Sequence, residues 1–103
     1  MRTLKRLNYN AAMSENRIHS VTIKRIADSV RAEAEVTLSG DAVQTITSSG
    51  LRGIRVDADP AYLRVVEDTQ LSELRKQLYA AGFSKRAIAT AVKSVVRVES
   101  RGD

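Results

Sequence analysis

Hydrophobic and β-branched residues alternate with polar ones in the middle of the chain, between Ala42 and Pro60. The alternation runs through residues 43–47, passes the turn-forming sequence Ser48-Ser49-Gly50 and resumes in residues 51–56. Two such runs on either side of a glycine-containing turn predict a β-hairpin. Pro60 ends the hairpin, because proline has no amide hydrogen to donate to a strand ladder.

The segment before this hairpin has the spacing of an amphipathic helix. From Ser14 onward, apolar residues recur three or four positions apart, which predicts a helix that ends near Ala32. Between Val30 and Leu38, apolar and polar residues also alternate with the period of a strand, so we place the change from helix to strand near Ala32. This strand and the hairpin then form a three-stranded antiparallel meander, with a turn at residues 39–41.

Residues 1–14 show a weaker helical pattern and predict a frayed arm, while residues 99–103 predict a loose tail. Leu4, Leu7 and Ala11 have helical spacing, but the asparagines between them are poor helix formers. Met13 could also start the chain, and the sequence leaves open whether Met1 or Met13 does so. The whole chain forms a single domain, because 103 residues are too few for two.

A leucine- and alanine-rich helix is predicted after Pro60, following a short connection at residues 61–66. Asp68 or Thr69 can cap its first turn. Its apolar residues form a heptad-like seam that suits a dimer interface: Leu71, Leu74, Leu78, Ala81, Ile88, Val92 and Val95.

Two interpretations of Gly82 stay open. Either Gly82 lies within one long helix, or it ends the helix in the left-handed conformation and Ser84 caps the next one. A break would also give the segment around Gly82 the outline of a DNA-binding helix-turn-helix. The close packing of a helix-turn-helix favours a small residue four positions before the glycine, but this position is occupied by Leu78.

Composition excludes several classes of protein. The chain has no cysteine, so it forms neither disulfides nor thiolate metal sites. No apolar run approaches the roughly 20 residues of a membrane-spanning helix, and no apolar stretch of a secretory signal follows the basic N-terminus. Small chains with a thin aliphatic core often gain burial by dimerising. We therefore expect a soluble cytoplasmic protein that binds no membrane and forms a homodimer.

The net charge of +5 is distributed unevenly. Residues 1–31 carry seven basic and two acidic side chains, residues 32–70 carry three and seven, and residues 71–103 carry seven and three. Basic ends and an acidic centre indicate a polyanionic partner. Adjacent cations suit phosphate neutralisation, and they occur on both flanks as Lys24-Arg25, Arg75-Lys76 and Lys85-Arg86.

The residues needed for catalysis are few. His19 is the only histidine, and Asp57 and Asp59 stand beside Pro60 at a predicted strand end, where carboxylates serve in turns. The sequence contains no phosphate-binding glycine loop, nucleophile elbow or cluster of metal ligands. We expect a protein that is not an enzyme and uses no metal, cofactor or small-molecule substrate.

The order of these parts resembles the YbaB/EbfC family of small bacterial nucleoid-associated proteins. The resemblance spans residues 20–95 and rests on short motifs, namely Val36-Thr37, Ser39-Gly40, Val43 to Thr47, Gly50 and Ile54-Arg55-Val56-Asp57. Ala58-Asp59 separates Asp57 from Pro60, so the family's Ile-x-Ile-Asp-Pro element is split in this chain. Ser84-Lys85-Arg86 is also more basic than the last helix of the family usually is.

The resemblance implies an α+β homodimer with projecting N-terminal helical arms, located in the nucleoid. It also implies binding of double-stranded DNA with low sequence specificity through basic residues of the terminal helices. In this chain the expected DNA-binding residues are Arg17, Lys24, Arg25, Arg31, Arg75, Lys76, Lys85, Arg86, Lys93 and Arg97. The acidic centre is expected to face away from the DNA. The alternative is an assembly or adaptor subunit that binds an acidic protein partner.

Overall fold

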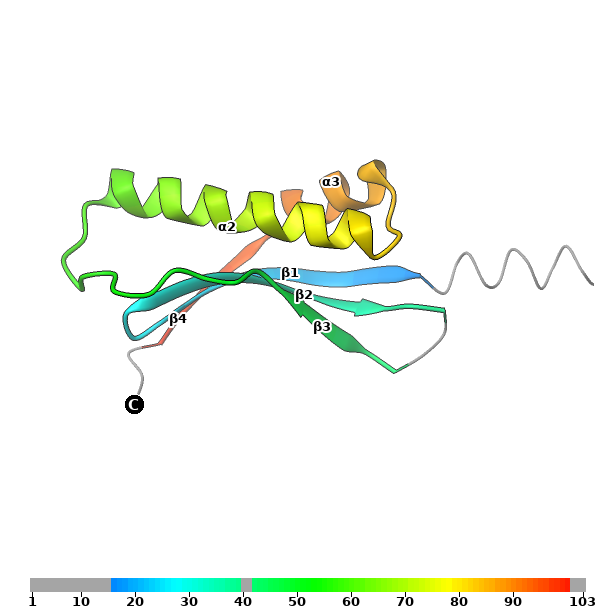
Figure 1. Ribbon diagram of the computed structural model, residues 1–103, viewed down its shortest axis with the longest axis horizontal. Coiled ribbons are helices and arrows are strands. Elements are labelled where there is room, and N and C mark those ends of the chain that lie inside the picture. The colour runs from blue at the N-terminus through cyan, green and yellow to red at the C-terminus, as the bar shows by residue number, and fades with distance from the viewer. Residues whose placement is uncertain (1–15, 40–41, 101–103) are drawn as a thin grey trace, which may run out of the picture.

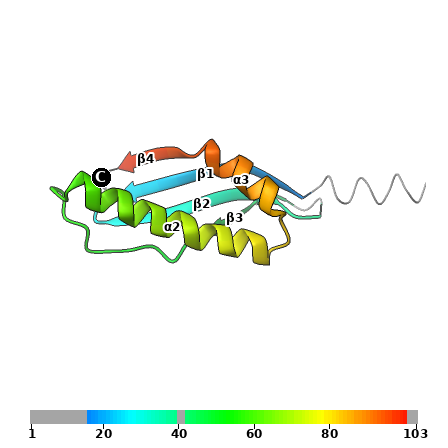
Figure 2. The ribbon, with the colours of Figure 1, turned by 90° about the horizontal axis from the view of Figure 1, so that it is seen from above.

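The computed structural model describes residues 16–39 and 42–100. Within them the elements follow the order β1 (Arg17–Ile26), β2 (Ser29–Thr37), β3 (Gln44–Thr47), α2 (Pro60–Ala80), α3 (Lys85–Lys93) and β4 (Val96–Ser100). The sheet has the strand order β3-β2-β1-β4, in which β2 is antiparallel to both neighbours and β4 is parallel to β1. Both helices cover one face of the sheet (Figures 1 and 2). The protein therefore has an α+β fold of two layers.

The helix predicted from Ser14 to Ala32 is wrong, because its described part is a β-hairpin. Five of the nine residues from Ile18 to Ile26 are β-branched, which favours a strand over a helix. A tight turn at Ala27-Asp28 joins β1 to β2; there Ala27 has a positive φ of 55°, and the Ser29 hydroxyl donates to the Ile26 carbonyl. Asp28 and Ser29 are common turn residues, but no glycine or asparagine stands at Ala27, where φ is positive, so the local signal for this turn is weak.

The hairpin predicted within residues 42–60 is also wrong, because both of its arms lie along β2 and not along each other. After β3 the chain continues in the same direction, and Leu51 forms a bridge with Val30. The register between β3 and this bridge shifts by one residue, so Ser48-Ser49-Gly50 is a β-bulge and not a reversal. Gly50 takes a φ of +83° in the bulge, a conformation that glycine adopts without strain.

Helix α2 begins earlier than predicted. Its N-cap is Asp59, whose carboxylate accepts a hydrogen bond from the Ala61 amide (2.9 Å), and Pro60 takes the first helical position. Asp68 and Thr69, the predicted caps, lie inside the helix. The sequence Asp-Pro is a strong helix start, because a carboxylate satisfies a free amide and proline is preset for the first turn.

Strand β4 was not predicted at all. Glu99 and Ser100, expected in a loose tail, pair with β1 in a parallel ladder instead. The connection from β1 to β4 passes through both helices, so this pairing joins the two ends of the described chain (Figure 1). Val96 and Val98 alternate with Arg97 and Glu99, so a short strand signal was present, but the pairing with β1 is set by a segment about 70 residues away along the chain.

The core lies between the sheet and the helices. Alternate residues of β1 and β2 are buried on this face, and Ala32 and Ala34 are fully buried. Helix α2 packs on β2 and α3 packs on β1. The helical residues buried here are Val66, Leu71, Leu74, Leu78, Ile88 and Val92. The seam that was predicted to form a dimer interface is therefore part of the core of a single subunit.

Some predictions fall outside the described residues. They are the helical arm of residues 1–14, the choice between Met1 and Met13, the Gly40-Asp41 part of one turn, and the last three positions of the tail.

Candidate nucleic-acid interface

The break after α2 brings two basic segments together. Gly82 has a φ of +110°, and its amide donates to the Tyr79 carbonyl while the Phe83 amide donates to the Leu78 carbonyl. These two bonds form a Schellman motif, which ends a helix at a left-handed residue. The Ser84 hydroxyl then accepts from the Ala87 amide and caps α3. The broken-helix interpretation, with Gly82 as the left-handed residue and Ser84 as the N-cap, is confirmed.

A groove of about 720 Å³ lies between α2 and α3. The apolar part of its lining comes from Ile88, Ala89 and Val92 of α3, together with Tyr79 of α2. Lys85 approaches Tyr79, with its Nζ 5.8 Å from the ring centroid, which is the range of a cation–π contact. The cations around the groove are Arg75, Lys76, Lys85 and Lys93. Four of the predicted DNA-binding residues thus lie around one surface.

These four cations are not neutralised within the described part of the chain. No carboxylate there forms an ion pair with any of them, and α3 itself contains no acidic residue. Arg86 is exposed on α3, next to the groove but not in its lining. The surface formed by α2 and α3 therefore keeps a concentrated positive charge, which can attract an anion.

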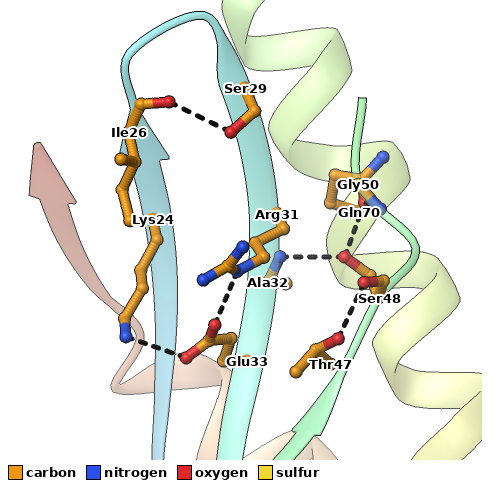
Figure 3. Close-up of polar contacts among 10 residues, drawn as sticks. All are labelled: Lys24, Ile26, Ser29, Arg31, Ala32, Glu33, Thr47, Ser48, Gly50 and Gln70. Carbon is orange, nitrogen blue, oxygen red and sulfur yellow. Dashed lines mark hydrogen bonds and ion pairs between the residues drawn. The ribbon is translucent and has the colours of Figure 1, made fainter. Parts of the chain in front are cut away.

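The N-terminal cations lie elsewhere. Lys24 and Arg31 extend from the sheet face opposite the helices, where they are cross-strand neighbours. Both form ion pairs with Glu33, at 2.9 Å from Lys24 Nζ and 2.6 Å from Arg31 Nε (Figure 3). The two basic flanks therefore do not form one surface in the described subunit.

The other predicted cations are separated as well. Arg97 pairs with Glu67 of α2 at 2.9 Å, and Arg25 donates to the Arg55 carbonyl at 3.1 Å. Arg17 is exposed at the start of β1. None of these three residues lines the groove between α2 and α3.

The acidic centre does not form one face turned away from the cations. Glu33 and Glu67 pair with basic residues of the flanks, Asp57 pairs with Arg55 at 3.0 Å, and Asp59 caps α2. The sequence reasoning missed these pairs, since they depend on which strands become neighbours. It also missed Tyr79 and the apolar lining of the groove. These residues stand on both sides of the Gly82 break, and this position in the sequence indicates that they come together when the helix is broken there.

Burial of Glu33 would raise its pKa, but hydrogen bonds and charge from Lys24 and Arg31 outweigh burial and hold the pKa below the ordinary value of 4.5. A carboxyl whose pKa is lowered by folding contributes stability above its unfolded pKa, and this contribution is lost as the pH falls through the folded pKa. The Glu33 ion pairs thus stabilise the sheet at neutral pH and lose that effect in acid.

Replacing Glu33 by glutamine should therefore lower the free energy of unfolding at neutral pH, and the difference from the parent should shrink as the pH falls below 4.5. Urea unfolding over a pH series measures this. Glu35→Gln is the matched control: Glu35 is exposed on the same strand and has no ion pair within the described residues. A difference that stays constant from neutral to acidic pH would contradict the prediction.

Residues suited to catalysis remain scattered. His19 shares a hydrogen bond of 2.7 Å with the Thr37 hydroxyl on the exposed ends of β1 and β2. Among residues 16–39 and 42–100, no group of three or more histidines and carboxylates could hold a metal ion. In the same ranges, no helix has the length and apolar character required to cross a membrane.

Comparison with known proteins assigns no family. No protein-family model, curated protein or solved structure matches this chain. The resemblance to the YbaB/EbfC family stays a prediction, and two features differ from the fold that it implies. The helix predicted from Ser14 to Ala32 is replaced by β1 and the start of β2 where the segment is described, and β4 adds a fourth strand.

Proposed function

We propose that the protein is a non-enzymatic, nucleoid-associated protein that binds double-stranded DNA as a homodimer. The phosphates are bound by cations of α2 and α3, namely Arg75, Lys76, Lys85, Arg86 and Lys93. The observation that carries this proposal is a contrast between cations: these five residues form no ion pair with a carboxylate of the described chain, whereas Lys24 and Arg31 share Glu33. A cation that is already paired with a carboxylate gains less binding free energy from contact with a phosphate, because the existing ion pair must be weakened or broken.

Binding of this kind depends on charge. Duplex DNA carries one negative charge per ~1.7 Å of its axis, and each phosphate contact releases a condensed counterion. Affinity therefore falls with salt, with a log–log slope of about −0.9 per contact. Helix α3 contains no asparagine or glutamine, so it lacks the amides that read adenine. We expect binding that tolerates most base-pair changes; a tight palindromic consensus in a site-selection experiment would instead favour the helix-turn-helix.

The double variant Lys85→Ala/Lys93→Ala should weaken binding to all duplex sequences alike. It should also flatten the salt dependence by about one unit per lost contact, because each lysine neutralises a phosphate without reading a base. Gel shifts on random duplex DNA at several salt concentrations measure both effects. Arg52→Ala/Arg64→Ala is the matched control, since it removes the same charge from exposed positions outside the groove. Equal losses in the two double variants would mean that only net charge matters and would contradict the proposed surface.

The apolar lining of the groove favours a second candidate, an adaptor that binds an acidic protein partner. An amphipathic helix with acidic flanks could place apolar residues against Ile88, Ala89 and Val92 while its carboxylates meet the surrounding lysines. Duplex DNA has no apolar group of that kind to insert. If the parent binds random duplex DNA no better than an unrelated protein of equal charge, the adaptor becomes the better assignment.

A further inference from the structure

Strand β4 forms one edge of the sheet. It pairs with β1 on one side, and no described element covers its other side (Figure 2). All five of its residues are exposed, and the side chains of Val96 and Val98 are 57% and 43% exposed. An uncovered edge offers unpaired backbone groups to another strand. Valines are not the residues that usually protect such an edge.

The backbone of β4 shows which groups are available. The Ser100 carbonyl accepts a hydrogen bond of 2.9 Å from the Ala27 amide, so the backbone groups of Ser100 point toward β1. Because these directions alternate along a strand, those of Val98 and Val96 also point toward β1. The amide and carbonyl groups of Arg97 and Glu99 therefore point outward. They lie two residues apart, which is the spacing needed to form hydrogen bonds with an added strand.

The side chains of β4 are complementary to a second copy of β4. In an antiparallel pair centred on Val98, Arg97 stands opposite Glu99 of the partner subunit, and Glu99 stands opposite Arg97 of the partner subunit. Opposite charges at directly facing positions stabilise an antiparallel pair, and like charges destabilise it. A pair centred on Arg97 would place two arginines opposite each other, and one centred on Glu99 would place two glutamates. Among the registers in which β4 residues 96–100 pair only with one another, the Val98-centred register alone matches both the charges and the outward backbone groups.

We propose that two copies of this chain form a dimer by antiparallel pairing of their β4 strands about a two-fold axis at Val98. The inference deepens the homodimer of the proposed function and rests on it, but it requires no DNA. Arg97 already pairs with Glu67, so in the dimer it lies between that carboxylate and Glu99 of the partner subunit. The two sheets join into one, with all helices on the same side. The groove between α2 and α3 of each subunit then lies on that same side.

The test reverses one charge on the edge. Glu99→Arg places two arginines opposite each other at both facing pairs, and the dimer dissociation constant should rise about tenfold or more. Asp68→Arg makes the same change of charge on the exposed side of α2 and should leave the constant unchanged. Arg97→Glu should weaken its own dimer too. A mixture of Glu99→Arg and Arg97→Glu chains should recover dimers, because every facing pair is then opposite in charge.

Sedimentation equilibrium without DNA measures the parent, the three variants and the mixture, and circular dichroism checks that each variant is folded. A parent that stays monomeric at high micromolar concentration would overturn both the homodimer and this interface. Dimers of Glu99→Arg as stable as those of Asp68→Arg would overturn the β4 interface alone. So would a mixture that dimerises no better than its separate components. Duplex binding is measured separately by gel shift, so its failure would remove the proposed function while leaving the sedimentation result intact.

Discussion

Replacing Leu78 by alanine is expected to lower the free energy of unfolding by about 2–5 kcal/mol, since it removes a buried side chain and leaves a cavity. Leu78 is fully buried near the end of α2, and its carbonyl accepts the Phe83 amide in the Schellman motif. Its side chain belongs to the core that holds both helices on the sheet. Val65→Ala, at a position that is 62% exposed on the same helix, should change the free energy by no more than about 0.5 kcal/mol.

The same variant tests where the leucine seam lies. If Leu78 packs inside one subunit, the loss measured by urea unfolding persists at protein concentrations where only monomer is present. If the seam formed a dimer interface, as its heptad-like spacing suggested, the loss would appear as weaker dimerisation and would vanish in the monomer. A change below about 1 kcal/mol in monomeric protein would contradict the assignment of Leu78 to the core.

The sequence predicted best those features that a few neighbouring residues determine. The Gly82 break and the Ser84 cap arise from hydrogen bonds within five residues, so the local pattern contained them. The same holds for β3, whose alternation of residue types is short and clear. Among the predicted DNA-binding residues, those near this break lie together because α2 and α3 are adjacent in the chain and pack against each other.

The sequence failed where partners distant in the chain decide the outcome. Apolar residues from Ile18 to Val30 fit a helical stripe, but β-branched side chains and pairing with β2 make the first part of this segment a strand. Once β1 and β2 pair, Lys24 and Arg31 meet Glu33 on the face away from the helices. Their predicted position on a helix was wrong because that segment forms strands, while their role in DNA binding stays a prediction.

A buried hydrogen-bond network explains why residues 48–50 form a bulge and not a reversal. The Ser48 hydroxyl accepts from the Ala32 amide at 2.9 Å and donates to Gln70 Oε1 on α2 (Figure 3). The same oxygen of Gln70 accepts from the Gly50 amide at 2.9 Å. Gln70 is 5% exposed and Ser48 is 2% exposed, so water cannot readily replace these bonds. Glu73 of α2 also accepts hydrogen bonds from the amide and the hydroxyl of Ser49, but Ser49 is exposed. Gln70 is therefore the side chain of α2 that holds the buried part of the bulge.

Gln70→Leu should therefore lower the free energy of unfolding by about 2–4 kcal/mol, because a hydroxyl and an amide lose their acceptor in the interior and each costs about 1–3 kcal/mol. Gln77→Leu on the same helix is the matched control: Gln77 is half-buried and bonds only to Glu73, at 3.2 Å, so its loss should cost far less. Urea unfolding gives the free energies, and hydrogen exchange should show the Gly50 amide losing protection in Gln70→Leu only. Unchanged protection of that amide, with stability equal to the parent, would mean that the bulge forms without Gln70. The local geometry of Gly50, with its positive φ, and the bonds from Ser49 to Glu73 would then be sufficient to set the register of the chain along β2.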